Sequence, residues 1–298
     1  MNKKTTILVT DSGLGGLSVF AGMAKTLAED KTYDSIRMIY FNAWPEQYKG
    51  YNHFPDMADR AKVFHNAMSA MAKFRPDKIF IACNTLSVIY PFTQFAKETQ
   101  IPVTGIIDHG VKMAAAALEA DPLSQAIIFA TPATIEGNSH KNALIKMGFK
   151  KERIITQPCL NLAGKIERDP FGREVKEMIH ANAKAAAAQL KDKTGQVFAL
   201  LCCTHFGYCK DLFDQALSLY TGTQVEILNP NDEMTAIACQ NAIPGGNPNI
   251  SMEIFSRVTW EESRLEAYDR LLSPICPQVA TALKTYTLDR DLFSIEIE

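Results

Sequence analysis

Four short polar clusters in the sequence each follow a run of apolar residues, and two of these clusters contain a cysteine. Those with a cysteine are Cys83-Asn-Thr85 and Cys203-Thr-His205, and the other two are Asp11-Ser12 and Thr131–Thr134. In open α/β sheets, ligands bind beyond the carboxyl ends of the strands. The four clusters therefore mark the expected ligand-binding positions.

The residue type and the position of the two cysteines are suited to acid–base chemistry. A cysteine between the end of a strand and the start of a helix feels the positive end of the helix dipole. With a neighbouring acid or base, a thiol whose ordinary pKa is about 8.5 then becomes a usable thiolate. A single buried cysteine is more often a small hydrophobic residue. Cys83 and Cys203 stand at matched strand ends, which favours a pair of reactive thiols facing one ligand.

A glycine-rich segment, Asp11-Ser-Gly-Leu-Gly-Gly16, follows the first apolar run. It matches neither the Gly-x-Gly-x-x-Gly dinucleotide pattern nor a phosphate-binding Walker loop. Two interpretations stay open. The glycines permit a tight turn, or their backbone N–H groups hold a substrate carboxylate by the physics that binds phosphate at helix N-termini.

A second cluster contains residue types that bind zinc: Cys202, Cys203, His205 and Cys209. Structural zinc sites repeat a Cys-x₂₋₄-Cys pair, and this sequence has no second pair. Adjacent residues such as Cys202 and Cys203 also point to opposite faces of a strand. We therefore expect no metal site.

Short apolar runs alternate with longer helical patterns, which is typical of a parallel sheet with crossover helices. Strands are expected at Ile7–Thr10, Arg37–Phe41, Lys78–Ala82, Pro102–Ile107, Ala126–Ala130, Arg153–Gln157, Val197–Cys202 and Val225–Leu228. Helices are expected at Leu17–Leu27, Met57–Phe74 and Glu174–Leu190. Pro244–Asn249 is typical of a loop, and Thr259-Trp-Glu-Glu262 is a capping-box pattern that predicts a helix through Leu272. The last stretch, Tyr286–Glu298, is compatible with a strand or with an acidic tail.

The polar clusters repeat at one offset. Asp11 and Thr131 are 120 residues apart, and so are Cys83 and Cys203. A shared offset between two pairs of strand ends indicates two lobes of similar plan. The predicted fold is therefore α/β, with two similar lobes that each hold a mostly parallel sheet flanked by helices.

The composition is that of an ordinary globular protein. The chain has 298 residues, 47% of them hydrophobic, and its 31 Lys and Arg against 33 Asp and Glu give a net charge of −2. This balance argues against nucleic-acid or membrane-surface partners, which require clustered positive charge. No apolar run approaches the about 18 residues of a membrane span. The start of the chain turns polar too soon for a signal peptide, so we expect a cytoplasmic protein whose seven cysteines are thiols.

Three segments resemble the hallmarks of the aspartate/glutamate racemase superfamily, most closely its glutamate racemases: Ile7–Leu17, Ala82–Thr85 and Cys203–His205. They occur in the family's order, and the resemblance runs from about residue 5 to residue 240. It implies two lobes with the active site between them. We expect residues 1–99 with 222–298 to form one lobe and residues 100–221 the other. The resemblance also implies a racemase that needs no pyridoxal phosphate, metal or nucleotide.

The resemblance further assigns roles to individual residues. It implies that Cys83 and Cys203 form the acid–base pair, that Asp11 orients or deprotonates Cys83, and that His205 acts beside Cys203. Glu167, eight residues after a cysteine as in the family, is the remaining catalytic candidate. The positions that line the family's amino-acid pocket correspond to Ser12, Asn84, Thr85, Thr131, Thr134 and Thr204.

One loop departs from the family pattern. Glutamate racemases usually read Phe-Gly-Asp-Thr-Ala-Arg-x-Pro-Tyr-Gly after the second strand, whereas this chain reads Phe-Asn-Ala-Trp-Pro-Glu-Gln-Tyr-Lys-Gly from Phe41 to Gly50. Lys49 then either contacts the side-chain end of the substrate or lies in solvent. The first alternative makes Lys49 a substrate-binding candidate.

The leading hypothesis is a cofactor-independent amino-acid racemase with glutamate as the default substrate, which would supply peptidoglycan precursors. Two alternatives stay open. The protein is a racemase or isomerase for aspartate, a hydantoin or another α-substituted acid, or it is a regulatory protein that binds the ligand without turnover. A redox or zinc thiol protein is less favoured. The expected partner is a small-molecule substrate, and the sequence also allows a homodimer.

Overall fold

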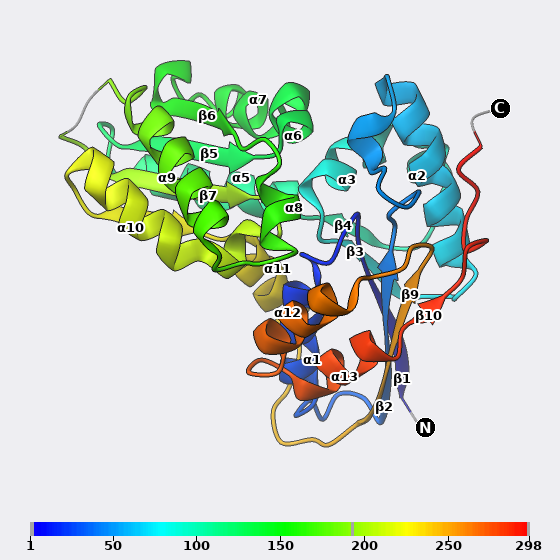
Figure 1. Ribbon diagram of the computed structural model, residues 1–298. Coiled ribbons are helices and arrows are strands. Elements are labelled where there is room, and N and C mark those ends of the chain that lie inside the picture. The colour runs from blue at the N-terminus through cyan, green and yellow to red at the C-terminus, as the bar shows by residue number, and fades with distance from the viewer. Residues whose placement is uncertain (1–2, 192–193, 297–298) are drawn as a thin grey trace. The chain divides into compact units, whose positions relative to one another are not determined.

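The computed structural model describes residues 3–191 and 194–296 of the chain, which divides into two compact units (Figure 1). Unit 1 runs to Gly105 and resumes at Met234, and unit 2 runs from Ile106 to Glu233. Each unit contains its own parallel sheet with helices packed on it. Within the described ranges, no helix is both long and apolar enough to span a bilayer.

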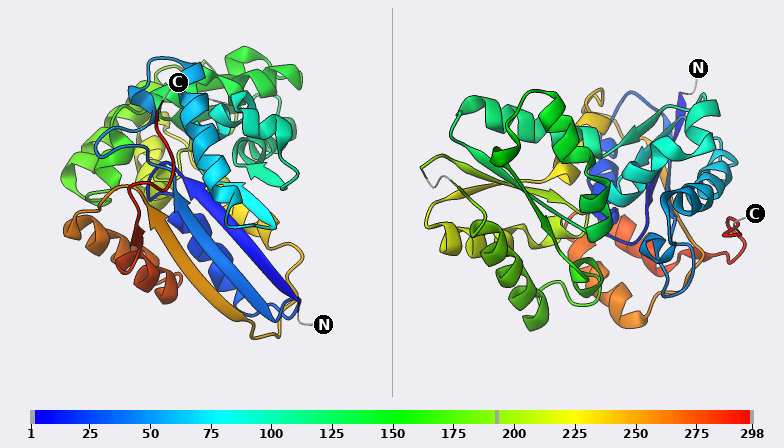
Figure 2. Two further views of the ribbon diagram at one scale, coloured as in Figure 1. Left: turned by 90° about the vertical axis from the view of Figure 1, so that its right-hand side faces the viewer. Right: turned by 90° about the horizontal axis from the view of Figure 1, so that it is seen from above.

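Unit 1 contains a six-stranded parallel sheet. Its strands, in spatial order, are β10 (Thr287–Leu288), β9 (Asn249–Ser256), β2 (Ser35–Asn42), β1 (Lys4–Asp11), β3 (Lys78–Ile81) and β4 (Val103–Gly105). Its helices are α1 (Leu17–Leu27), α2 (Met57–Ala72), α3 (Asn84–Ile89), α4 (Gln94–Glu98), α12 (Glu262–Leu272) and α13 (Pro277–Lys284), with short 3-10 turns at Tyr51–His53 and Tyr90–Phe92. Figure 2 shows β9, β2 and β1 side by side.

The two faces of the unit 1 sheet are covered by different helices. Ile39 and Phe41 of β2 belong to one buried cluster together with residues of α2 and α3. Tyr40, which alternates with them, contacts Phe20 of α1 at 5.7 Å between ring centroids. The α12 and α13 helices pack with α1, so they lie on the Tyr40 face.

Unit 2 contains a four-stranded parallel sheet. Its strands, in spatial order, are β6 (Ile154–Pro158), β5 (Gln125–Ala130), β7 (Val197–Cys202) and β8 (Val225–Leu228). Its helices are α5 (Ile107–Ala120), α6 (Pro132–Gly137), α7 (Ser139–Lys146), α8 (Leu162–Ile166), α9 (Arg173–Ala187) and α10 (Lys210–Thr221), and α11 (Pro230–Ala238) crosses the boundary between units. Short 3-10 turns occupy Lys151–Arg153 and Phe206–Cys209. Residues of α9 and α10 fill one core cluster, and residues of α5 and α7 fill the other.

The internal repeat has a structural counterpart. In unit 1 the first four strands lie in the order β2-β1-β3-β4, and in unit 2 the corresponding strands lie in the order β6-β5-β7-β8. In unit 1, β2 is added on one side of β1 and β3 on the other, so the strand order switches between β1 and β3. In unit 2 the order switches in the same way between β5 and β7. Ligands bind at such switch points in α/β sheets. Asp11 and Cys83 flank the first switch point, and Thr131 and Cys203 flank the second.

All eight predicted strands are confirmed, and α1 has the predicted bounds. Strand β9 was not predicted, although it pairs with β2 along its whole length. The predicted helix through Leu272 is confirmed, but its predicted capping box is wrong, because α12 begins at Glu262 and its start has no side-chain cap. Thr259 instead donates its backbone N–H and its hydroxyl to Gln47 Oε1, at 2.9 and 3.2 Å. Of the predicted tail, residues 297–298 lie outside the described part.

Candidate active site

Unit 1 brings Cys83 and Ser12 together at the carboxyl end of its sheet. Ser12 Oγ lies 3.2 Å from Cys83 Sγ. Cys83 is the N-cap residue of α3, and its sulfur accepts the Leu86 backbone N–H at 3.5 Å. A sulfur in this position has two polar neighbours that stabilise negative charge. We call Asp11, Ser12, Cys83 and Asn84 the Cys83 cluster.

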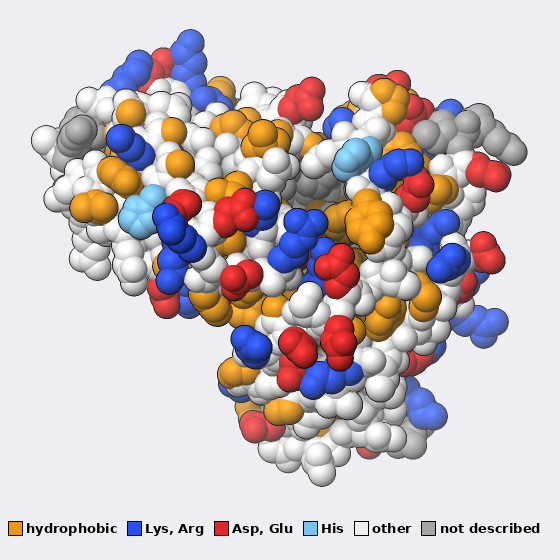
Figure 3. All heavy atoms as spheres, viewed as in Figure 1, with side chains coloured by type: hydrophobic (Ala, Val, Ile, Leu, Met, Phe, Trp, Pro, Cys, Tyr) orange, Lys and Arg blue, Asp and Glu red, His pale blue; other side chains and the backbone are white. Residues whose placement is uncertain are grey.

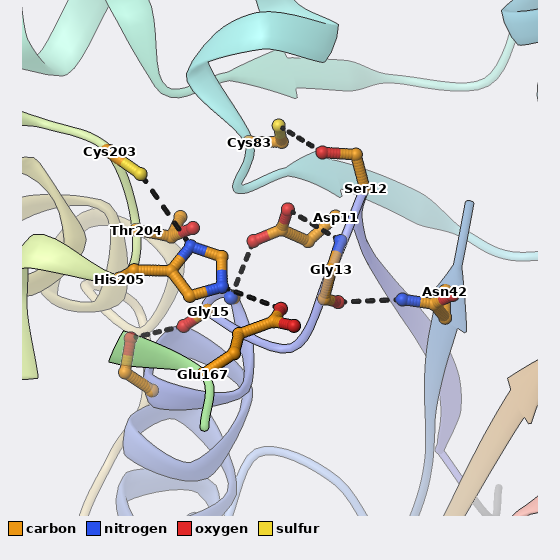
Figure 4. Close-up of polar contacts among 12 residues, drawn as sticks. Asp11, Ser12, Gly13, Gly15, Asn42, Cys83, Glu167, Cys203, Thr204 and His205 are labelled. Atoms are coloured by element: carbon orange, nitrogen blue, oxygen red, sulfur yellow. Dashed lines mark hydrogen bonds and ion pairs between the residues drawn. The ribbon is translucent and has the colours of Figure 1, made fainter. Parts of the chain in front are cut away.

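The Asp11 side chain stabilises the glycine-rich turn by hydrogen bonds to its backbone. Its carboxylate accepts the backbone N–H of Gly16 at 2.6 Å. It also accepts that of Gly13 at 3.2 Å (Figure 4). A Cβ atom on Gly16 would lie 2.9 Å from Asp11 Cβ, so this position has room only for glycine. The turn interpretation of the glycines is therefore the one that the structure supports, since Asp11 itself occupies these two N–H groups.

The surroundings of Cys83 hold its thiol in the protonated form. Burial raises the pKa of Cys83 and the charge of Asp11 raises it further, while the hydrogen bonds from Ser12 and from backbone N–H groups oppose both effects. The net result is a pKa well above the ordinary thiol value. Cys83 is therefore a proton donor at rest, and it needs Ser12 and these N–H groups to stabilise its thiolate.

Asn84 offers an unused amide beside Cys83. The side chain is buried, and neither its oxygen nor its nitrogen has a hydrogen-bond partner within the described residues. Buried amides are normally paired, so this one is available to a ligand or a water. Thr85, the next residue of α3, is half-buried.

Unit 2 brings Cys203, His205 and Glu167 into a hydrogen-bonded row (Figure 4). Cys203 Sγ lies 3.6 Å from His205 Nδ1, and His205 Nε2 lies 2.7 Å from Glu167 Oε1. All three side chains are buried. Glu167 follows directly on α8, so the predicted carboxylate reaches the imidazole across 38 residues of chain. We call these three residues, together with Thr204, the Cys203 cluster.

The charge on His205 is set by its two neighbours. Burial alone lowers its pKa, but hydrogen bonds to Cys203 and Glu167 and the charge of Glu167 outweigh burial and hold the pKa well above its ordinary value. The row therefore contains an imidazolium between a sulfur and a carboxylate. The protonated His205 ring can donate from Nδ1 to the sulfur of Cys203.

The predicted threonines of unit 2 also lie at the ends of its strands. Thr131 is the N-cap residue of α6, and its hydroxyl lies 3.1 Å from that of Thr134. The backbone oxygen of Thr204 accepts the side-chain N–H of Asn231 at 2.9 Å, which fixes the chain next to Cys203.

The remaining cysteines of this region serve the core. Cys202 and Cys203 belong to the core clusters on opposite faces of the sheet, as strand alternation predicts. Cys209 Sγ donates to the Pro170 carbonyl at 3.2 Å. Within residues 3–191 and 194–296, no three His, Cys, Asp or Glu side chains are grouped as metal ligands.

Lys49 lies at the surface in this structure. Its ammonium pairs with Glu46 at 3.1 Å, and its side chain is 59% exposed. The neighbouring Tyr48 is 73% exposed and has a positive φ of 67°. Of the two alternatives for Lys49, this position favours the solvated one.

Sequence reasoning missed the residues that hold the strand ends of unit 1. Asn42 Nδ2 donates to the Gly13 carbonyl at 2.7 Å, and Ser256 Oγ donates to Asn42 Oδ1 at 3.3 Å. The only signal was the position of Asn42 directly after a predicted strand. Ser256 carried no signal, because the strand that ends with it was not predicted.

Residues 7–238 match the profile of the Asp/Glu/Hydantoin racemase family. This span covers well over half of the chain. The chain belongs to this family. Two relatives are the glutamate racemases of Campylobacter jejuni and Vibrio vulnificus. The first is 28% identical over 224 residues, which are 75% of this chain and 80% of the relative. The second is 28% identical over 270 residues, which are 89% of this chain and 92% of the relative.

Solved structures of family members share the fold. A glutamate racemase from Bacillus anthracis superimposes with a TM-score of 0.66 at 22% identity, over 90% of this chain and 94% of the other. A glutamate racemase from Francisella tularensis gives a TM-score of 0.66 at 19% identity, over 92% and 95%. The racemase family and its two-sheet α/β architecture are thus established for this chain.

Proposed function

We propose that this protein interconverts L- and D-glutamate by moving the α-proton between two thiols, without a cofactor. The observation that carries the proposal is the matched placement of Cys83 and Cys203. Each follows the third strand of its unit's repeat, and each is bonded to a polar partner of its own. The relatives from Campylobacter jejuni and Vibrio vulnificus are glutamate racemases, and the Francisella tularensis structure contains D-glutamate.

The two clusters place oppositely charged groups beside the two thiols. Cys203 stands beside the imidazolium of His205, and Cys83 stands beside the carboxylate of Asp11. In one direction, the Cys203 thiolate accepts the α-proton and the Cys83 thiol donates its proton to the opposite face of the carbanion. Cys203 ends as a thiol and Cys83 as a thiolate, and the reverse transfer converts the other enantiomer.

The unpaired amide of Asn84 supports the binding half of the proposal. Its oxygen and nitrogen can accept from an ammonium group and donate to a carboxylate, the two groups that every α-amino acid carries. Ser12, Thr85, Thr131, Thr134 and Thr204 supply further hydroxyl groups at the strand ends.

The test is incubation of the full chain with each glutamate enantiomer in D₂O. We expect exchange of the α-proton for deuterium and loss of optical rotation at equal total concentration. Exchange without a change of rotation would show proton abstraction from one face only and would contradict the racemase. Binding of glutamate without exchange would indicate the regulatory alternative.

A second candidate substrate class stays open because of the loop from Phe41 to Gly50. This loop shares only its ends with the family pattern. Parallel incubations with aspartate, hydantoins and neutral amino acids therefore belong in the same experiment. If one of these compounds exchanged its α-proton faster than glutamate, that compound would become the assigned substrate. The proposed two-thiol mechanism would be unchanged.

A further inference from the structure

Tyr51 carries a buried hydroxyl group that nothing in the described chain satisfies. The side chain is 2% exposed, and its hydroxyl oxygen has no hydrogen-bond partner within residues 3–191 and 194–296. Its ring packs against Phe54 and Phe64, with ring centroids at 6.2 and 6.0 Å. It belongs to the same buried cluster as Cys83. Because an unpaired buried hydroxyl is costly, phenylalanine would serve this core better unless a ligand uses the hydroxyl.

Strand register brings Arg257 to the same edge of the sheet as Ser12. Asp11 pairs with Asn42 across β1 and β2, and Asn42 pairs with Ser256 across β2 and β9. Ser12 and Arg257 are thus the first residues beyond the ends of two strands, separated by two strand spacings, or about 10 Å. An extended arginine side chain covers much of that distance.

The alternation of side chains places both residues on one face of the sheet. Asn42 donates to the Gly13 carbonyl and Ser256 donates to Asn42, so these two side chains share one face, and the residues after the strand ends point to the other. Two contacts agree with this. Ser12 meets Cys83, and the Arg257 guanidinium lies over the Phe293 ring, 4.9 Å from its centroid. Phe293 and Cys83 belong to one buried cluster.

The guanidinium of Arg257 is charged but forms no hydrogen bond or ion pair within the part of the chain that the structure describes. The acidic groups around it are Glu46, Asp289 and Asp291, and none of them is within ion-pair distance. Burial raises the pKa of the Tyr51 hydroxyl, and the charge of Arg257 opposes that rise. Tyr51 therefore lies in the electrostatic field of the arginine.

We infer that the Tyr51 hydroxyl and the Arg257 guanidinium form the subsite for the side-chain carboxylate of the substrate. This inference rests on the proposed racemase function and narrows its substrate class to acidic amino acids. Both groups donate hydrogen bonds, and one of them is positively charged, which is the combination that recognises a carboxylate. A neutral side chain leaves the arginine without a counter-charge, and a basic one is repelled.

The experiment compares Tyr51→Phe and Arg257→Met with matched controls from the same unit. Tyr268→Phe removes the hydroxyl of a buried tyrosine on α12, on the other face of the sheet. Arg37→Met removes a guanidinium that also lies over a phenylalanine ring, that of Phe74, near the opposite end of β2. Racemisation of glutamate and of glutamine, calorimetric binding of glutamate and melting temperature are measured for each variant.

For both test variants we expect KM for glutamate to rise about 10-fold or more while kcat changes little, the pattern of lost ground-state binding. Arg257→Met should also lower the preference for glutamate over glutamine by a similar factor. If both residues hold one carboxylate, the double variant should lose less than the product of the single effects. The controls should keep the KM of the unaltered protein.

Two results would overturn the inference. One is a Tyr51→Phe variant that melts at a higher temperature with an unchanged KM, because the hydroxyl is then only an unsatisfied group in the core. The other is an Arg257→Met variant whose glutamate preference equals that of Arg37→Met. If the unaltered protein exchanges no α-proton at all, the racemase proposal fails. Calorimetric binding of glutamate to the variants then still decides the subsite.

Discussion

At the scale of single residues, the two cysteines proposed to transfer the proton have opposite electrostatic surroundings. Cys83 is buried beside a carboxylate, which raises the pKa of its thiol. Cys203 is buried beside His205, whose pKa is raised by hydrogen bonds to Cys203 and Glu167 and by the charge of Glu167. The two thiols therefore have a carboxylate and an imidazole as their respective neighbours. The same difference lets each thiol be tested on its own.

Replacing either thiol by a hydroxyl tests the proton transfer. In Cys83→Ser and Cys203→Ser we expect racemisation to fall by at least about 10²- to 10⁴-fold, because a serine hydroxyl is scarcely ionised at neutral pH. With an amino acid that carries a β-leaving group, each variant should eliminate that group from one enantiomer only. The two variants should act on opposite enantiomers in this elimination. Near-normal racemisation by either one would contradict the assignment of the pair.

The charge on His205 predicts a pH-dependent stability. Since the hydrogen bonds and charge described above raise its pKa in the folded state, its contribution is fully present below the unfolded value of about 6.5 and is lost as pH rises through the raised value. Glu167→Gln should lower the pKa of His205 and reduce the free energy of unfolding at pH 6 by about 1–3 kcal/mol. NMR titration of the His205 ring and urea unfolding at pH 6 and pH 9 measure both effects. An unchanged ring pKa would show that Glu167 does not hold the imidazolium.

At the scale of elements, the site depends on how strand ends and helix starts are tied together. Asp11 ends β1 and binds the turn that leads into α1, while Cys83 joins β3 to α3. The Gln47 side chain connects the loop after β2 to Thr259 after β9, and Trp44 meets Trp260 at 6.2 Å between ring centroids. These ties hold the divergent loop in place through a strand that is remote in sequence.

Gly16→Ala tests the tightest of these ties. The new Cβ would lie 2.9 Å from Asp11 and 3.1 Å from Ala82 Cβ, so we expect a loss of about 1–3 kcal/mol in the free energy of unfolding. Gly164→Ala in α8 is the control. Nothing lies within 4 Å of its Cβ position, and alanine there should stabilise by up to about 1 kcal/mol through helix propensity. Urea denaturation of both variants provides the comparison, and equal stabilities would contradict the packing argument.

At the scale of the whole molecule, the same strand order occurs in both units. Both units order their first four strands alike and place a cysteine after the third. On the face shown in Figure 3, basic and acidic side chains are interspersed. This agrees with the near-neutral balance of the sequence, which gives no reason to expect a polyanionic partner.

The chemistry of the whole chain predicts its response to inhibitors. Within residues 3–191 and 194–296 no cluster of metal-ligating side chains is present, and the proposed transfer uses only thiols. Racemase activity should therefore survive dialysis against EDTA and treatment with a carbonyl reagent such as hydroxylamine. It should be lost on alkylation with iodoacetamide. Restoration of dialysed activity by zinc, or a requirement for pyridoxal phosphate, would contradict the two-thiol mechanism.

The sequence alone determined the eight strands of the two repeated halves and the residues that follow them. These features depend on local chemistry, since buried parallel strands are short β-branched runs and their ends are polar. The repeat at 120 residues marked Cys83 and Cys203 as equivalent positions, and the common strand order of the two sheets bears this out.

Only the tertiary structure showed which residues, distant in sequence, contact the strand ends and the loops that follow them. Strand β9 has polar residues along much of its length, so its sequence does not identify it as a buried strand. It is recognised only by its pairing with β2. Thr259 favours a helix cap by its own chemistry, but Gln47 takes its hydrogen bonds. The unpaired hydroxyl of Tyr51 became visible only in the packed core, and the position of Arg257 only once the pairing of β9 with β2 was known. The pairing of β9 with β2 and the contact between Gln47 and Thr259 span roughly two hundred residues, and local propensity carries no information about such contacts.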